Sequence, residues 1–236
     1  MKENNILIHT CCAICSGYPI KYLRELGYVP IAYFFNPNIY PDAEYQKRLE
    51  AQKILCKALD CELIVEDYVP DSYLQSIDDL ITPHPNPTSR KRYSIVPSAE
   101  SQGARGFCDN SSNTLTVSRY EFYNKEMAGF ENYPEGSERC RKCFEIRLLK
   151  TAQKAKELKI GNFTTTLSIS PHKDFNVIQE IGKSLADCYK IDFADINFKK
   201  QDGFVKTNKI AQELNLYRQN YCGCRIDAKM QRGKDV

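Results

Sequence analysis

Seven of the eleven cysteines in this 236-residue chain are gathered in three short groups. The groups are Cys11, Cys12 and Cys15; Cys140 and Cys143; and Cys222 and Cys224. Thiolates are the ligands of zinc and of iron–sulfur clusters, and paired thiols also carry out two-electron redox chemistry. The groups therefore predict a metal centre, a redox site or both.

The first two groups together could supply four thiolate ligands. Cys140 and Cys143 lie three residues apart in a segment with helical periodicity, so they share one helix face. The start of a helix and the neighbouring basic residues both favour thiolates. Cys11 and Cys12 follow the first predicted strand and supply the other two. Adjacent cysteines fit the knuckles of a structural zinc site poorly, so an iron–sulfur cluster is favoured, with zinc and unligated thiols as the alternatives.

The third group is the sequence Cys222-Gly223-Cys224. Residues two apart in an extended chain are separated by about 7 Å, at the upper limit of the Cα separation that a disulfide tolerates. A bridge between the two thiols therefore requires a bend at Gly223, which has no side chain to oppose it. Such a small ring is strained and readily reduced, as a two-electron relay requires. A second metal site and a pair without a role are the other interpretations.

The segments around these groups alternate between strand and helix patterns. Short apolar runs predict strands at 5–10, 29–35, 61–68, 163–169 and 191–198. Helical patterns cover 18–28, 40–59, 137–158, 173–189 and 201–216. This alternation predicts a single α/β catalytic domain over residues 1–236, with a parallel sheet and flanking helices. Ligands of such sheets lie at the carboxyl ends of strands, where the first and second cysteine groups fall.

Residues 76–127 interrupt this alternation. They contain prolines, polar clusters and little periodicity, which predicts an irregular insertion. The insertion includes Cys108 and a basic cluster at residues 90–92. Three further cysteines lie inside predicted helices or strands and are interpreted as packing or surface residues: Cys56, Cys61 and Cys188.

Composition and charge are those of an ordinary globular protein, with 42% hydrophobic and 27% charged residues and a net charge of +3. That charge is weak evidence for a nucleic-acid partner, although residues 138–159 are locally basic. The N-terminal segment has too few apolar residues for a signal peptide, and no run of about 18 apolar residues occurs. We therefore expect a cytoplasmic protein that has no membrane partner and whose cysteines form no disulfide framework.

Six motifs, taken in order, resemble those of the QueH family of epoxyqueuosine reductases. They are HTCCAICS, FFNPNIYPDAEYQKR, PEGSERCRKCFEIRLLKTAQKA, FTTTLSISPHKD, DINFKK and LYRQNYCGC. The resemblance extends over nearly the whole chain except about residues 76–127, which look like an insertion relative to the family. It implies a nucleotide α-hydrolase-like fold. It also implies the last step of queuosine biosynthesis, in which epoxyqueuosine at the wobble position of a tRNA is reduced to queuosine.

The resemblance also implies a role for each cysteine group. The ligand positions of a [4Fe-4S] cluster match Cys11, Cys12, Cys140 and Cys143. The positions of a redox-active disulfide match Cys222 and Cys224. A position implied to lie near a second, mononuclear iron is aspartate in some members and is Cys15 here. Members of the family use no cobalamin, and the sequence does not identify the electron donor.

Other residues in the matched motifs are candidates for proton transfer and RNA contact. The candidate proton donors are His9, Asp42 and His172. The tyrosines that could stack on the target base are Tyr40, Tyr45, Tyr217 and Tyr221. The cations that could meet phosphates are Arg147, Lys150 and Lys154.

Two other functions fit the sequence less well. An ATP-using tRNA modifier of the same fold needs a glycine-rich phosphate loop after its first strand, and the sequence CCAICSG has bulky side chains and one glycine there. A zinc-stabilised RNA-binding module without catalytic activity would leave the Cys222 and Cys224 pair unexplained. The reductase is therefore the favoured function.

Overall fold

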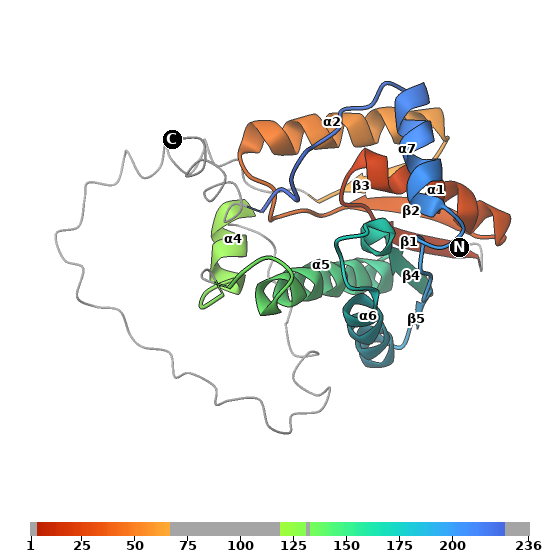
Figure 1. Ribbon diagram of the computed structural model, residues 1–236. Coiled ribbons are helices and arrows are strands. Elements are labelled where there is room, and N and C mark those ends of the chain that lie inside the picture. Colours follow the sequence, from red (N-terminus) through yellow and green to blue (C-terminus); the bar gives the residue numbers. More distant parts are fainter. Residues whose placement is uncertain (1–3, 67–118, 131–132, 225–236) are drawn as a thin grey trace, which may run out of the picture.

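The computed structural model describes residues 4–66, 119–130 and 133–224 (Figure 1). Its centre is a five-stranded sheet of parallel strands in the order β3-β2-β1-β4-β5. The strands are β1 (Asn5–His9), β2 (Val29–Phe34), β3 (Glu62–Val65), β4 (Asn162–Thr165) and β5 (Asp192–Phe193). The predicted α/β class with a parallel sheet is confirmed.

Helices cover both faces of the sheet (Figure 1). One face carries α1 (Ala13–Glu25), α2 (Asp42–Ala58) and α7 (Gly203–Glu213). The other face carries α5 (Glu138–Glu157) and α6 (Phe175–Tyr189). Among the helices that the structure describes, none combines the length and the apolarity needed to cross a membrane.

The central strand β1 forms the middle of the core. Its residues Ile6, Leu7 and Ile8 are completely buried, as expected for a strand with neighbours on both edges and helices on both faces. The chain adds β2 and β3 on one side of β1, then crosses over to add β4 and β5 on the other side. The carboxyl ends of β1 and β4 therefore form the point at which the winding direction reverses, where such sheets bind their ligands.

Several element boundaries differ from those predicted. Helix α1 begins at Ala13 instead of residue 18, so Cys15 lies in its first turn. The predicted strand at 163–169 divides into β4 and the short 3₁₀ helix η2 (Thr166–Ile169), because the Thr165 hydroxyl accepts a hydrogen bond from the Leu167 amide and turns the chain. The predicted strand at 191–198 contains only two residues in regular pairing, at the sheet edge.

The last part of the segment predicted to be irregular is also regular. Helix α4 (Arg119–Glu126) falls inside the range 76–127. Tyr123 and Met127, four residues apart and therefore on one helix face, are only 3% and 2% exposed. The prediction of irregular structure is thus wrong for these residues. Polar residues around them hide the helical spacing of the two buried side chains in the sequence. The rest of the insertion, with Cys108 and residues 90–92, lies outside the described residues.

Candidate functional site

The first cysteine group lies where β1 ends and α1 begins. Cys11 and Cys12 form the connection, and Cys15 follows in the first turn of the helix. The three sulfur atoms lie within 4.8 Å of one another, and all three residues are buried. We call these residues the thiol triad. Three buried sulfurs that converge on one point form a donor set suited to a soft metal.

Hydrogen bonds connect the thiol triad to neighbouring elements. The Sγ atoms of Cys11 and Cys12 are 3.8 Å apart, and the hydroxyl of Thr166, the first residue of η2, lies 3.6 Å from Sγ of Cys11. Nε2 of Gln219 donates to Sγ of Cys12 at 2.8 Å. Hydrogen bonds from Cys12 and Cys15 lower the pKa of Cys11 well below its ordinary value. The hydrogen bond between Cys11 and Cys12 raises the pKa of Cys12 to about 12, so negative charge concentrates on Cys11.

Cys140 and Cys143 lie in the first turns of α5, at the same edge of the sheet. Cys143 is buried, whereas Cys140 is half-buried and its Sγ accepts a hydrogen bond from the Gly136 amide at 3.2 Å. Neither of these two sulfurs belongs to the thiol triad, in which Cys15 is the third member beside Cys11 and Cys12. Of the four predicted cluster ligands, the structure therefore brings Cys11 and Cys12 into contact and leaves the α5 pair farther away.

Two cations, buried Arg147 and half-buried Lys173, lie near these thiols. Arg147 is 4% exposed, one helical turn after Cys143. Burial lowers the pKa of Arg147, but the charges of Cys143 and Cys11 outweigh this and raise it. Lys173 is affected in the same way, with Cys11 and Cys15 as the charges that raise its pKa. Both side chains therefore stay positive and balance the charge of thiolates at this edge.

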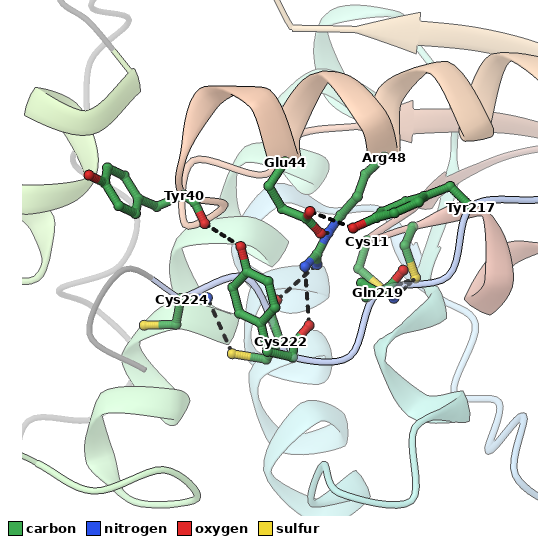
Figure 2. Close-up of polar contacts among 10 residues, drawn as sticks. Cys11, Tyr40, Glu44, Arg48, Tyr217, Gln219, Cys222 and Cys224 are labelled. Carbon is green, nitrogen blue, oxygen red and sulfur yellow. Dashed lines mark hydrogen bonds and ion pairs between the residues drawn. The ribbon is translucent and has the colours of Figure 1, made fainter. Parts of the chain in front are cut away.

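The third cysteine group forms a loop beside α2 (Figure 2). We call residues 222–224 the Cys-Gly-Cys loop. Cys224 forms an isolated antiparallel bridge with Ile39, and the Tyr40 amide donates to the Gly223 carbonyl at 2.9 Å. Gly223 has a φ of +97°, which provides the bend that the sequence predicts. The Cys224 amide donates to Sγ of Cys222 at 3.3 Å, and both residues are present as thiols.

A buried ion pair on α2 holds the Cys-Gly-Cys loop in place (Figure 2). Nη1 and Nη2 of Arg48 donate to the carbonyls of Cys222 and Tyr221, each at 3.1 Å. Nε of Arg48 donates to Glu44 at 2.7 Å, and the hydroxyl of Tyr217 donates to the other oxygen of Glu44 at 2.6 Å. The side chains of Arg48 and Glu44 are 3% and 8% exposed. Sequence analysis missed this pair, since charges four residues apart are typical of a solvated helix face.

Two further residues contact Cys224: Arg139, one of the basic residues expected to favour thiolates at the start of the helix, and Tyr123, which sequence analysis missed. Nη1 of Arg139, on α5, lies 3.7 Å from Sγ of Cys224, and the hydroxyl of Tyr123, on α4, lies 3.9 Å from it. Burial raises the pKa of Tyr123, and the charges of Cys143 and Cys224 add to this effect. The Tyr123 phenol therefore keeps its proton and lies between Cys143 of α5 and Cys224 of the Cys-Gly-Cys loop. No sequence signal indicated Tyr123, because its helix was not predicted.

The candidate proton donors differ in their surroundings. His9 is completely buried, with Nδ1 3.0 Å from the Thr165 hydroxyl and Nε2 3.1 Å from the Phe35 carbonyl. A carbonyl only accepts, so Nε2 carries the proton. Burial and then the charge of Arg147 lower the pKa of His9 to about 3, so the ring is neutral. His9 therefore fastens β1 to its neighbours, whereas Asp42 and His172 are exposed.

The predicted RNA-contacting residues also separate by burial. Tyr45 is 6% exposed and packs edge-on against Phe34, so it belongs to the core. Tyr217 and Tyr221 flank the Cys-Gly-Cys loop and are partly exposed. Lys154 is paired with Glu66 and Glu157, at 3.8 and 2.9 Å. Tyr40 is half-buried beside the same loop, Lys150 lies over the Phe122 ring, and Arg147 is buried.

The fold and the site define an α/β protein with a thiol-rich centre at the switch point of its parallel sheet. The family model described as epoxyqueuosine reductase QueH matches residues 6–122 and 101–229. This chain belongs to the QueH family, whose members are oxidoreductases.

Individual relatives agree with this membership. A QueH from Streptococcus pyogenes is 30% identical over 233 residues, which cover 96% of this chain and 71% of that protein. A QueH from Helicobacter pylori is 33% identical over 96% of this chain, which spans half of the relative's length. A QueH from Thermotoga maritima is 29% identical, with 93% of this chain and 88% of the relative covered.

Proposed function

We propose that this protein reduces epoxyqueuosine to queuosine at the wobble position of a tRNA, with an iron–sulfur cluster and the Cys-Gly-Cys loop as its redox groups. The observation that carries the proposal is that the thiol triad and the Cys-Gly-Cys loop meet at one edge of the sheet. Gln219 joins them, because its side chain donates to Cys12 only three residues before Cys222. Family membership supports the reaction, and the reaction needs no cobalamin.

The donor set fits a cluster bound by thiolates. Cys11 and Cys12 with the two α5 cysteines would hold a [4Fe-4S] cluster, and Cys15 would lie near an adjacent mononuclear iron. Burial of the sulfurs and the nearby positive charges of Arg147 and Lys173 suit such a group. When bound, the cluster supplies electrons one at a time.

The Cys-Gly-Cys loop supplies the complementary chemistry. Removal of the epoxide oxygen as water consumes two electrons and two protons. Oxidation of the Cys222 and Cys224 thiols to one disulfide releases two electrons and two protons. The loop is already bent at Gly223, so the two sulfurs can approach each other without a large backbone movement. An external electron donor must then reduce the disulfide before the next turnover.

The surface beside the loop suits a single-stranded nucleotide. Tyr217 and Tyr221 present partly exposed rings, with the cations of Lys47 and Arg48 5.7 and 5.2 Å from the respective ring centroids. Unstacked bases of RNA loops bind to aromatic rings, and the exposed cation of Lys47 is available to a phosphate, whereas Arg48 is engaged with Glu44 and the loop carbonyls. The wobble base of an anticodon loop is accessible without opening a duplex.

Nucleoside analysis of a tRNA that carries epoxyqueuosine tests this function. The tRNA is incubated anaerobically with protein reconstituted with iron and sulfide, in the presence of a chemical reductant. We expect queuosine from the wild type and from Cys61→Ser, a buried cysteine at the far edge of the sheet, and none from Cys222→Ser. No queuosine from wild type with a full complement of iron and sulfide would refute the proposal. Zinc without sulfide in the purified protein would favour the RNA-binding module.

A further inference from the structure

The two thiols of the Cys-Gly-Cys loop lie in different environments although one residue separates them. Cys222 is exposed, whereas Cys224 is 6% exposed. The chain bends at Gly223 between the two residues, and Cys224 contacts Tyr123 of α4 and Arg139 of α5. Reagents and protein partners can reach only a sulfur that is exposed, so the two thiols are not equivalent in exchange reactions.

The buried thiol lies against polar side chains of α4 and α5. Nη1 of Arg139 lies 3.7 Å from Sγ of Cys224, and the Tyr123 hydroxyl lies 3.9 Å from it. Arg139 is itself 1% exposed, so its charge acts in a region with little water. Sγ of Cys222, at the exposed end of the loop, accepts a hydrogen bond from the Cys224 amide at 3.3 Å. A cation and a hydroxyl donor stabilise a thiolate at Cys224, which suits this sulfur to leave when the exposed sulfur of Cys222 is attacked.

We propose that Cys222 is the thiol that exchanges with the external reductant, that Cys224 is the internal thiol, and that Arg139 positions and stabilises the Cys224 thiolate. This inference rests on the proposed function, because it assigns the two halves of the redox pair. It also names the chemistry of the electron donor, a dithiol that reaches the protein surface beside Cys222.

The dithiol reduces the disulfide between Cys222 and Cys224 in two exchange steps. In the first, one thiolate of the dithiol attacks Sγ of Cys222. The bond between Cys222 and Cys224 breaks, its electron pair stays on Sγ of Cys224, and a mixed disulfide forms between the donor and Cys222. In the second, the other thiolate of the donor attacks the donor sulfur of that mixed disulfide and releases Cys222. The donor ends as a disulfide, the pair has gained two electrons, and the two protons of the dithiol end on the two cysteines.

Position-resolved alkylation of the reduced, reconstituted protein tests the assignment. Trypsin releases residues 219–225, a peptide that contains Cys222 and Cys224 and no other cysteine. After brief anaerobic treatment with limiting iodoacetamide, tandem mass spectrometry of this peptide distinguishes the two positions. We expect label at Cys222 to exceed label at Cys224 by about tenfold. Equal labelling, or faster labelling of Cys224, would overturn the proposal.

The role of Arg139 is tested by the rate at which dithiothreitol reduces the pre-formed disulfide. Arg139→Gln should slow this reduction by about tenfold, the effect of losing one hydrogen bond to a charged group. Arg139→Lys should restore part of the rate, because it keeps the charge. Arg141→Gln, a half-buried arginine of the same helix that pairs with Glu180 instead, serves as the matched control and should leave the rate unchanged. Equal rates for the Arg139 and Arg141 variants would refute the positioning role.

These measurements are independent of the reaction on tRNA. If Cys222 labels first but wild type forms no queuosine, the proposed function fails and the assignment of the two thiols stands. If queuosine forms and Cys224 labels first, the proposed function stands and the assignment fails.

Discussion

Replacing Arg48 by methionine tests how the Cys-Gly-Cys loop is held. Arg48→Met keeps most of the side-chain volume and removes the charge and its donors. The change leaves the Glu44 carboxylate buried with the Tyr217 hydroxyl as its remaining side-chain partner. It also leaves the carbonyls of Tyr221 and Cys222 without the guanidinium. Both the folded state and the loop should therefore become less stable.

The size of the effect follows from burial. Both members of the pair are almost inaccessible, with side chains 3% and 8% exposed. Removing one partner of a buried ion pair costs about 3–5 kcal/mol, because the other charge stays buried. Since Tyr217 continues to donate to Glu44, we expect the lower end, about 3 kcal/mol. Loss of the two carbonyl contacts should also raise the fraction of time that the loop is open by about tenfold or more.

Two assays measure these effects. Urea unfolding followed by circular dichroism gives the loss of unfolding free energy, and the rate of tryptic cleavage after the exposed Arg218 reports opening of the loop. Lys53→Met is the matched control, because Lys53 lies on the same helix and pairs with Glu50 at 3.5 Å while both side chains are more than half exposed. That variant should lose less than about 0.5 kcal/mol.

The reasoning would be refuted by an Arg48→Met variant that loses no more stability than Lys53→Met. A double variant gives a sharper test. If Arg48 and Glu44 act as a pair, Glu44→Gln combined with Arg48→Met should cost less than the sum of the two single changes, by about 1 kcal/mol or more. Additive costs would mean that the two side chains do not interact in solution.

Three other substitutions test the packing and the donor set of the site. Gly203→Ala should cost about 1–3 kcal/mol in urea unfolding, because a methyl group would overlap the Phe198 carbonyl oxygen. Gly223→Ala should cost about 1–2 kcal/mol in the same assay, because its φ is +97° and its Cβ would lie 2.9 Å from Nη1 of Arg48. Cys15→Ser should lower the iron bound per reconstituted chain and leave acid-labile sulfide unchanged, because this thiol lies beside the proposed cluster ligands.

Each of these changes has a control or an opposing result. Gly161→Ala introduces a methyl group with no atom within 4 Å, so it should change stability by less than about 0.5 kcal/mol. Variants at Gly203 or Gly223 that are as stable as this control would contradict the contacts described. A parallel fall of iron and sulfide in Cys15→Ser would mean that this thiol supports the cluster itself.

The sequence by itself determined the class of fold and marked the cysteine groups for which redox chemistry is proposed. Apolar runs and helical periodicity alternate along the chain, and short-range patterns of this kind suffice to predict a parallel α/β sheet. Because loops at the carboxyl ends of parallel strands gather at one edge, the same pattern placed Cys11 and Cys140 on one side of the molecule. The resemblance to the QueH family, carried by six local motifs, led to the membership that the family model confirms.

Only the tertiary structure decided how these residues are grouped and supported. Cys15 joins Cys11 and Cys12 because α1 starts earlier than its pattern indicates. Arg48 meets residue 222, and Tyr123 meets Cys224, across 174 and 101 positions of the chain. Local patterns carry no information about such contacts, and a buried charge has the same sequence pattern as a solvated one. Burial and long-range packing are therefore what distinguish a loop that merely contains two thiols from one that holds them in unequal environments.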